Sequence, residues 1–246
     1  MSPFPSKGTP LARRWQWLSI YLFVRQTTSR LLLRCFVDPR LLTKPTQKRS
    51  SFDGKLGLSP PNVKFEVDDI EDSWTYTRPF DYIHSRMMNS SICKWDEYLR
   101  QSYKHLNPGG WLELQEFHLP VSDDGTLAED GAIHRSMRLL GEAAAKTDGA
   151  FVDLDALKPM MEAVGFVDVA EVRFKWPSNT WPRDGRYKEL GSWNHENITR
   201  GLQGFLMAAL TRGLGWHADE VNVPAAQARK DIGDRSIHAY WPMIVV

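Results

Sequence analysis

The stretch Leu-Asn-Pro-Gly-Gly-Trp-Leu-Glu-Leu-Gln-Glu, residues 106–116, joins the end of a predicted helix to the start of a predicted strand. Residues 107–110, Asn-Pro-Gly-Gly, predict a turn because proline and glycine end helices. Trp111–Phe117 then predicts a strand, and Phe80–His84 predicts an earlier one. The helix between them has its apolar residues on one stripe, which consists of Trp95, Tyr98, Leu99, Tyr103 and Leu106. The order strand, helix, strand predicts two parallel strands joined by a right-handed crossover.

The segments on either side continue this alternation. Val63, Phe65 and Val67 alternate with polar residues, which predicts a strand. A run of carboxylates follows it, Asp68, Asp69, Glu71 and Asp72. Downstream we expect a helix at 127–147, a second helix at 154–164 that ends at Gly165, and a strand at 166–174. A helix with an apolar stripe from Ile198 to Leu210 and a helix with Pro224 near its start should follow. The chain should close with a strand at 238–246. These elements predict an α/β fold with helices on both faces of the sheet.

Composition divides the chain into two parts, the second of which contains an insertion. Residues 1–60 form a basic, poorly patterned N-terminal extension with a net charge of +9, whereas the remaining residues have −8. Residues 61–246 form the patterned domain. Within it, residues 176–195 are rich in Pro, Gly, Arg and aromatic residues, which predicts a lid-like insertion over a pocket.

The extension allows several interpretations. We expect a helix over Leu11–Phe36, and no membrane span, because Arg25, Arg30 and Arg34 interrupt the apolar residues there. The excess of arginine over acids also matches a mitochondrial transit peptide, so mitochondria stay an alternative to the cytoplasm or nucleus. A nucleic-acid partner is disfavoured because no binding motif accompanies the charge.

The two cysteines, Cys35 and Cys93, lack the spacing of a zinc site or a disulfide framework. The sequence therefore predicts no metal site, and the shortage of cysteines favours a reducing compartment.

Three segments occur in an order typical of a known family. They are Asn62–Trp74, Phe80–Met88 and Leu106–Glu116, and the closing His238–Pro242 agrees with them. Together they resemble the Rossmann-like class I S-adenosylmethionine-dependent methyltransferases. The fungal group related to the global regulators of secondary metabolism, with its TAM domain, is the most similar. The resemblance covers about residues 60–246, and it implies S-adenosylmethionine as cofactor and an unidentified methyl acceptor.

The resemblance also implies a cofactor site. In the family, the acid after the third strand accepts a hydrogen bond from the adenine amino group, which corresponds to Asp69 with Asp68 as its neighbour. Ile70 would pack on the adenine ring. His84, Ser85 and Arg86 follow the next strand and would lie beside the methionine part. No catalytic residue is implied, because an activated sulfonium needs alignment more than a general base.

Other candidates are weaker. Glu113 and Glu116 could be mistaken for an acid and base pair, but they point to opposite faces of their strand. His118 lies just past that strand, where a lone histidine is more often structural. Asp68 and Asp69 also have a simpler interpretation as a solvated acidic turn, and Arg86 as the partner of a nearby acid.

The sequence departs from the family before Asn62. A complete member has a strand, a Gly-x-Gly turn and a second strand there, but residues 53–57, Asp-Gly-Lys-Leu-Gly, have the wrong spacing. We therefore expect the N-terminal strand-helix-strand unit to be missing or altered, either by a gene-model error or in a genuinely shortened protein. Methyl transfer is the leading prediction for the family, and we expect this chain to bind the cofactor weakly or not at all. The alternative is a noncatalytic binding or scaffold protein that meets a protein partner through Trp176, Trp181 and Trp193.

Overall fold

The computed structural model describes residues 32–37, 63–89, 91–146 and 151–246. The chain divides into two compact units, Met1–Ile70 and Glu71–Val246. No helix in the described ranges is both long and apolar enough to cross a membrane.

The described part of the first unit is a pair of antiparallel strands, β1 (Leu32–Val37) and β2 (Val63–Asp68). The predicted strand at Val63–Val67 is therefore confirmed. The helix predicted over Leu11–Phe36 is wrong for residues 32–36, because their Leu, Cys and Phe side chains also suit a strand once a partner strand is available. Its earlier part, and the link at 43–59, lie outside the described residues.

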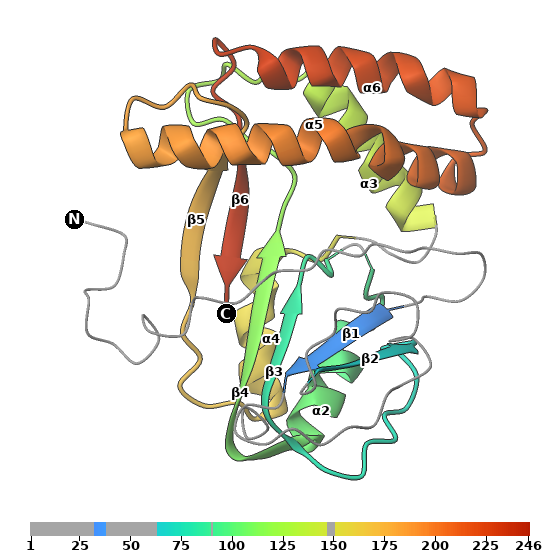
Figure 1. Cartoon of the computed structure of the whole chain (residues 1–246), viewed down its shortest axis with the longest axis vertical. Helices are drawn as coiled ribbons and strands as arrows, with labels where there is room; N and C mark the ends of the chain where they lie inside the picture. Colours follow the sequence, from blue (N-terminus) through green and yellow to red (C-terminus); the bar gives the residue numbers. More distant parts are fainter. Residues whose placement is uncertain (1–31, 38–62, 90, 147–150) are drawn as a thin grey trace. The chain divides into compact units, whose positions relative to one another are not determined.

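The second unit is built on a four-stranded mixed sheet of order β3-β4-β6-β5 (Figure 1). Strand β3 (Phe80–Arg86) is parallel to β4 (Leu106–Phe117), as predicted from the strand-helix-strand order. Strand β6 (Tyr240–Val245) runs antiparallel to both β4 and β5 (Val172–Pro177). The carboxyl ends of β3 and β4 consequently lie at the same edge of the sheet.

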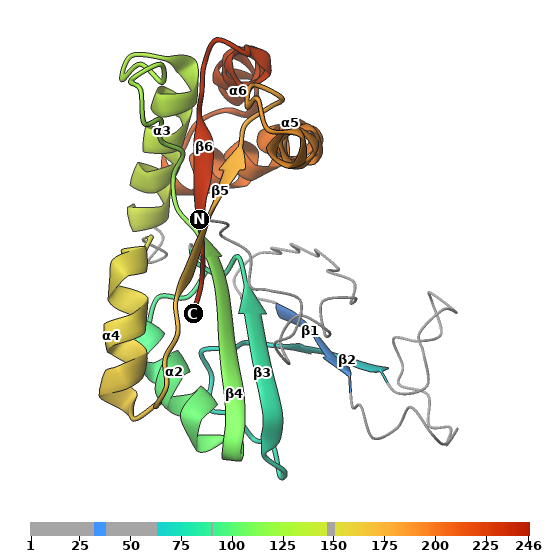
Figure 2. The same ribbon diagram turned by 90° about the vertical axis from the view of Figure 1, so that its left-hand side faces the viewer.

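Helices α2 (Trp95–Lys104) and α4 (Leu154–Val164) cover one side of β3 and β4 (Figure 2). Helix α4 ends at Gly165, as predicted, and this residue adopts a φ of 117° that suits glycine. The turn predicted at 107–110 falls inside β4, which begins at Leu106. The chain is irregular there, because the register between β3 and β4 shifts between Phe80 and Tyr82 and Gly109 has a φ of 77°. The side chain of Asn107 donates a 2.7 Å hydrogen bond to Asp81, which fastens this early part of β4 beside β3.

Helices α3 (Ala132–Lys146), α5 (Gly185–Gly213) and α6 (Ala218–Gly233) build an apolar core around one end of β6. In Figure 2, α5 and α6 lie on the side of the sheet opposite to α2 and α4. The predicted α/β class with helices on both faces is therefore confirmed. The stripe from Ile198 to Leu210 is also confirmed, since Leu202, Leu206 and Leu210 are all buried in this core.

Several predicted boundaries need correction. The helix expected from Leu127 begins at Ala132, and the strand expected from Phe166 begins only at Val172. Pro224 is the seventh residue of α6 and does not lie near its start. The lid-like segment at 176–195 is a loop only between β5 and Gly185, where α5 begins. Asp184 explains this start, because its carboxylate accepts hydrogen bonds from the amides of Arg186 (2.9 Å) and Tyr187 (3.2 Å).

Candidate functional site

Strand β3 ends in His84, Ser85 and Arg86, the three predicted contacts of the methionine part. Ser85 lies on the buried face of the sheet, and its hydroxyl has no hydrogen-bond partner in the described part of the chain. His84 and Arg86 point to the other face. There the His84 Nδ1 atom lies 3.2 Å from a carboxylate oxygen of Glu113, and the Arg86 guanidinium lies 5.7 Å from the centre of the Trp176 ring.

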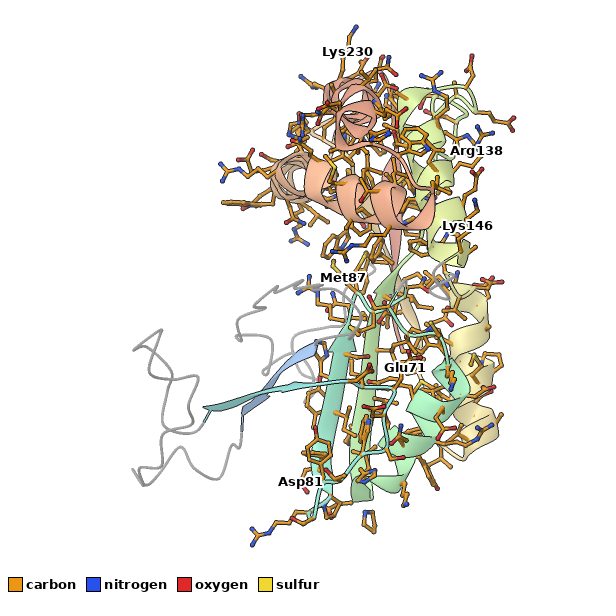
Figure 3. The ribbon with its side chains drawn as sticks, turned by 90° about the vertical axis from the view of Figure 1, so that its right-hand side faces the viewer. Glu71, Asp81, Met87, Arg138, Lys146 and Lys230 are labelled. Carbon is orange, nitrogen blue, oxygen red and sulfur yellow. The ribbon has the colours of Figure 1, made fainter. Side chains whose placement is uncertain are left out.

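The chain after β3 makes a constrained turn at Met87–Asn89. Met87 has a φ of 55°, which is uncommon for a residue with a side chain. One oxygen of Glu116 accepts hydrogen bonds from the amides of Met88 (2.8 Å) and Asn89 (2.9 Å). Figure 3 shows Met87 at the carboxyl end of β3, far from Asp81 near the strand's start. Strained backbone of this kind persists only where surrounding contacts fix it, and it is frequent at functional sites.

Asn89 fastens the same turn to two further segments. Its amide nitrogen donates to the carbonyl oxygens of Phe117 (3.0 Å) and Val152 (3.3 Å), and its amide oxygen accepts from the Val152 backbone at 2.7 Å. Asn89 is fully buried. The ends of β3 and β4 and the chain entering α4 are thus held together by one side chain.

Glu116 is the most unusual group at this edge. It is fully buried on β4, and burial raises its pKa to about 8 despite the hydrogen bonds from Met88 and Asn89. Its second oxygen has no hydrogen-bond partner within the described ranges. Sequence reasoning set this residue aside, since only the tertiary structure shows what surrounds it.

Glu113 points away from Glu116, as expected from their spacing. Burial pushes the pKa of Glu113 upward, but the hydrogen bond and charge of His84, with help from Tyr82, bring it below the ordinary value. Glu113 therefore serves as the partner of His84 on the opposite face of the sheet, and the two glutamates share no site.

The three predicted adenine contacts belong to the first unit. Asp68 is the last residue of β2, and Asp69 and Ile70 follow it. Strand β2 pairs with β1 and is not part of the four-stranded sheet, contrary to the expected arrangement of neighbouring parallel strands. The structure therefore brings His84, Ser85 and Arg86 together in one unit and leaves the other three in the other unit.

One carboxylate of the acidic run has a structural role. Glu71 accepts hydrogen bonds from the backbone amides of Cys93 (2.7 Å) and Lys94 (2.8 Å), just before α2. These amides would otherwise lack partners within the helix, and a negative charge is favourable at this end of a helix.

An open pocket of about 560 Å³ lies between the start of α2 and the chain that enters α4. Its walls come from Cys93–Glu97 and Arg100 on one side and from Phe151, Val152 and Met160 on the other. Val152 is the residue that Asn89 holds, so the pocket adjoins the carboxyl ends of β3 and β4. No local sequence pattern indicates this pocket, because its two walls are distant in the chain.

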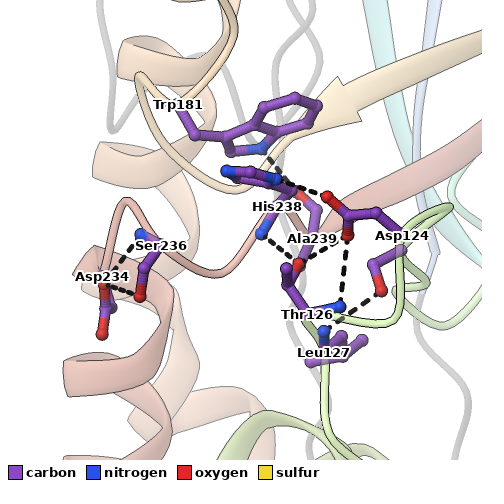
Figure 4. A network of polar contacts seen from close by, with 9 residues as sticks. Asp124, Thr126, Leu127, Trp181, Asp234, Ser236, His238 and Ala239 are labelled. Carbon is purple, nitrogen blue, oxygen red and sulfur yellow. Dashed lines mark hydrogen bonds and ion pairs between the residues drawn. The ribbon is translucent and has the colours of Figure 1, made fainter.

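A second polar cluster lies where the chain enters β6 (Figure 4). The His238 Nδ1 atom lies 2.5 Å from Asp124, and the His238 amide donates a 2.8 Å hydrogen bond to Thr126. Hydrogen bonds from the His238 side chain, the largest cause, and from the hydroxyl and amide of Thr126 lower the pKa of Asp124 to about 2. The Trp181 ring lies tilted against His238, with ring centres 4.9 Å apart, and its indole nitrogen donates a 2.9 Å hydrogen bond to the carbonyl of Ala239. The cluster fastens three loops to one another.

The tryptophans of the alternative scaffold prediction do not form one exposed surface. Trp193 is 71% exposed on α5, whereas Trp181 is partly buried against His238 and Trp176 against Arg86. Within the described ranges, no group of three or more His, Cys, Asp or Glu residues is arranged to hold a metal ion.

The sequence is similar to several curated fungal proteins. Methyltransferase pytC of Aspergillus terreus is 38% identical over 189 residues, which is 76% of this chain and 58% of that protein. Probable methyltransferase tdiE of Emericella nidulans is 36% identical over 78% of this chain and 59% of that protein. Secondary metabolism regulator LAE1 of Cochliobolus heterostrophus is 34% identical over 74% of this chain and 61% of that protein. The chain thus spans about three fifths of the length of these relatives.

A solved structure of Haemonchus contortus phosphoethanolamine N-methyltransferase 2 with S-adenosyl-L-methionine is also similar, at 16% identity and a TM-score of 0.35, over 68% of this chain and 32% of that chain. The family model described as "Methyltransferase domain" matches residues 14–171. This match includes most of the segment that composition separates as an extension. The predicted resemblance to the fungal group is confirmed, and the chain belongs to the methyltransferase domain family.

Proposed function

We propose that this chain catalyses methyl transfer from S-adenosylmethionine to an acceptor held at the carboxyl ends of β3 and β4, with weak binding of the cofactor. The supporting observation is that this edge holds two buried polar atoms without partners in the described part of the chain, one oxygen of Glu116 and the hydroxyl of Ser85. Buried polar atoms are almost always hydrogen-bonded, and ligands of α/β sheets bind at this edge.

The residues at this edge suit such a ligand. The strand register pairs Ser85 with Leu114, and Glu116 lies two residues beyond Leu114 on β4. Ser85 and Glu116 therefore lie on the same face of the sheet. A hydroxyl and a protonated carboxyl can both donate hydrogen bonds to the oxygen or nitrogen atoms of a cofactor. When bound, S-adenosylmethionine supplies a methyl group that is already activated on a sulfonium. The protein then has to align the acceptor and exclude water, for which the fixed turn at Met87–Asn89 provides a rigid wall.

We assign Asp68, Asp69 and Ile70 to the adenine and His84, Ser85 and Arg86 to the methionine part, following the family resemblance. The assignment to adenine depends on the first unit, and the sequence of residues 1–61 contains no Gly-x-Gly motif. Glycine is needed in that turn because the backbone has to approach the cofactor closely. Loss of those contacts is the physical reason for expecting weak binding.

Calorimetric titration of the whole chain with S-adenosylmethionine tests this function. We expect saturable binding with a dissociation constant of about 0.1–1 mM, equivalent to about 4–5.5 kcal/mol. Micromolar binding would contradict the proposed weakness and show that another segment replaces the glycine turn. No binding at 10 mM, about ten times the weakest expected constant, would contradict the use of this cofactor.

A noncatalytic binding role is the second candidate. It is favoured by the aromatic side chains on the face of β3 and β4 that α2 and α4 leave uncovered, where Tyr82 is 50% and Trp111 is 63% exposed. Exposed aromatic residues of this size are enriched where proteins meet partners. A chain that fails to bind S-adenosylmethionine and loses self-association or partner binding with Trp111→Ser would support this alternative.

A further inference from the structure

We propose that the pocket between α2 and α4 binds the methyl acceptor, and that this acceptor is a small, uncharged and largely aromatic molecule. The inference rests on the proposed methyl transfer and names the substrate class for it. The volume of this pocket, about 560 Å³, lies in the range of pockets that bind small-molecule ligands.

The pocket occupies the place where an acceptor has to lie. Asn89 lies three residues after Arg86, and its side chain is hydrogen-bonded to the backbone of Val152 in the pocket wall. The neighbouring Phe151 ring contacts Phe117, the last residue of β4, with ring centres 6.3 Å apart. The pocket wall is therefore continuous with the sheet edge at which we place the cofactor's methionine part.

Both walls are held by contacts within the protein. Glu71 fixes the backbone of Cys93 and Lys94 on the α2 side, while Asn89 fixes Val152 on the other side. Trp95, only 5% exposed, packs edge-on against Tyr98 at 5.8 Å between ring centres. A pocket with walls fixed in this way needs little reordering when a ligand binds, which lowers the entropic cost of binding.

The chemistry of the walls indicates the ligand class. Trp95, Phe151 and Met160 offer aromatic and thioether surfaces, which pack well on flat aromatic rings. The charged rim is balanced, because Lys94 and Arg100 are matched by Asp96 and Glu97. A phosphate or carboxylate would gain from two cations and lose to two carboxylates, so the rim favours an uncharged ligand.

Nuclear magnetic resonance of the methionine methyl groups tests the site, with 2-naphthol as the uncharged probe and 2-naphthoate as its anionic counterpart. The whole chain is labelled at its methionine methyls, and Met160→Leu assigns the resonance of the pocket wall. We expect 2-naphthol to shift Met160 saturably and to leave Met207 on α5 unchanged. Equal shifts at both methionines, or none at Met160, would overturn the proposed site.

Matched substitutions sharpen the result. Val152→Trp should fill the pocket and weaken 2-naphthol binding at least tenfold, whereas Val167→Trp, at a position that is 83% exposed, should leave it unchanged. Circular dichroism verifies that both variants fold, and Lys94→Trp at the exposed rim replaces Val152→Trp if that variant does not. Unchanged binding in the pocket-filling variant would exclude the site.

The charge argument has its own test. In the wild-type chain 2-naphthoate should bind several-fold more weakly than 2-naphthol, and Asp96→Asn with Glu97→Gln should improve naphthoate alone. Equal affinity for the two probes before and after this change would overturn the uncharged ligand class.

The last measurement separates this proposal from the proposed function. All probe titrations are made without cofactor and are then repeated with S-adenosylmethionine. Displacement of 2-naphthol by the cofactor would contradict an acceptor site. Cofactor binding without any probe binding would remove the pocket proposal alone, whereas probe binding without cofactor binding would remove the methyl transfer and with it the acceptor role.

Discussion

Glu116 shows how a single residue can link folding to protonation. The side chain is fully buried, and its pKa of about 8 means that the folded protein holds it mainly protonated at neutral pH. In an unfolded chain the same group would be ionised at that pH. Folding therefore takes up a proton between the ordinary pKa and about 8, so the stability falls as the pH rises through this interval.

Glu116→Gln should remove this pH dependence. The amide keeps an oxygen for the amides of Met88 and Asn89 but cannot titrate. In urea unfolding, the wild-type free energy of unfolding should fall by up to about 1.4 kcal/mol per pH unit between pH 5 and 8, while that of the variant should fall less.

Glu113→Gln is the matched control on the same strand. The pKa of Glu113 is lowered, so its contribution is present above its ordinary pKa and is lost only as the pH falls through the folded value. Glu113→Gln should therefore leave the fall in the free energy of unfolding between pH 5 and 8 unchanged. Parallel pH profiles for the wild type and Glu116→Gln would show that Glu116 is not protonated in the folded protein.

At the scale of elements, α5 decides the shape of the region where a lid was expected. The helix has 29 residues, begins after the Asp184 cap and includes five glycines with different surroundings. Gly191 packs against the loop after β5, where an added Cβ would lie 2.0 Å from the Asn179 carbonyl oxygen. A Cβ added at Gly201 would have no neighbouring atom within 4 Å. Packing therefore requires glycine at 191 but not at 201.

Gly191→Ala and Gly201→Ala should therefore have opposite effects. The clash at 191 should lower the free energy of unfolding by about 1–3 kcal/mol, as overpacking does. The change at 201 should raise it by up to about 1 kcal/mol, because alanine is the better helix former. Thermal or urea unfolding of both variants measures this, and a stabilised Gly191→Ala would contradict the close approach of α5 to Asn179.

The start of α5 gives a second prediction at this scale. Asp184→Ala removes the acceptor of the Arg186 and Tyr187 amides and should cost about 1 kcal/mol of stability. Asp184→Asn retains an acceptor oxygen and should cost much less. An equal loss in both variants, measured by urea unfolding, would show that the negative charge and not the hydrogen bond stabilises this helix end.

At the scale of the whole second unit, α3, α5 and α6 bury a cluster of apolar side chains together with Trp241 of β6. Leu206, Leu210 and Ile232 are fully buried there. Phe151, which lines the pocket, packs against this core. The core and the pocket wall are therefore joined through one side chain.

Leu206→Ala should lower the free energy of unfolding by about 2–5 kcal/mol, because it leaves a cavity in this core. Val167→Ala, at a position that is 83% exposed, should change it by less than about 0.5 kcal/mol. Urea unfolding of both variants gives the comparison. A loss below 1 kcal/mol for Leu206→Ala would mean that the cluster is not closely packed.

The sequence by itself determined the family, the α/β class and the parallel pairing of β3 with β4, because these depend on local patterns and on segments in order along the chain. It also placed Glu113 and Glu116 on opposite faces, since side chains alternate along any strand. Capping by Gly165 was readable for the same local reason.

Only the tertiary structure decided what depends on contacts between distant segments. The pairing of Leu32–Val37 with β2, the early start of β4 and the start of α5 each follow from partners that local sequence does not specify. The same holds for the site. Burial by the surrounding segments makes Glu116 a neutral acid, and Asn89 joins three segments up to 63 residues apart, so no motif could reveal either one.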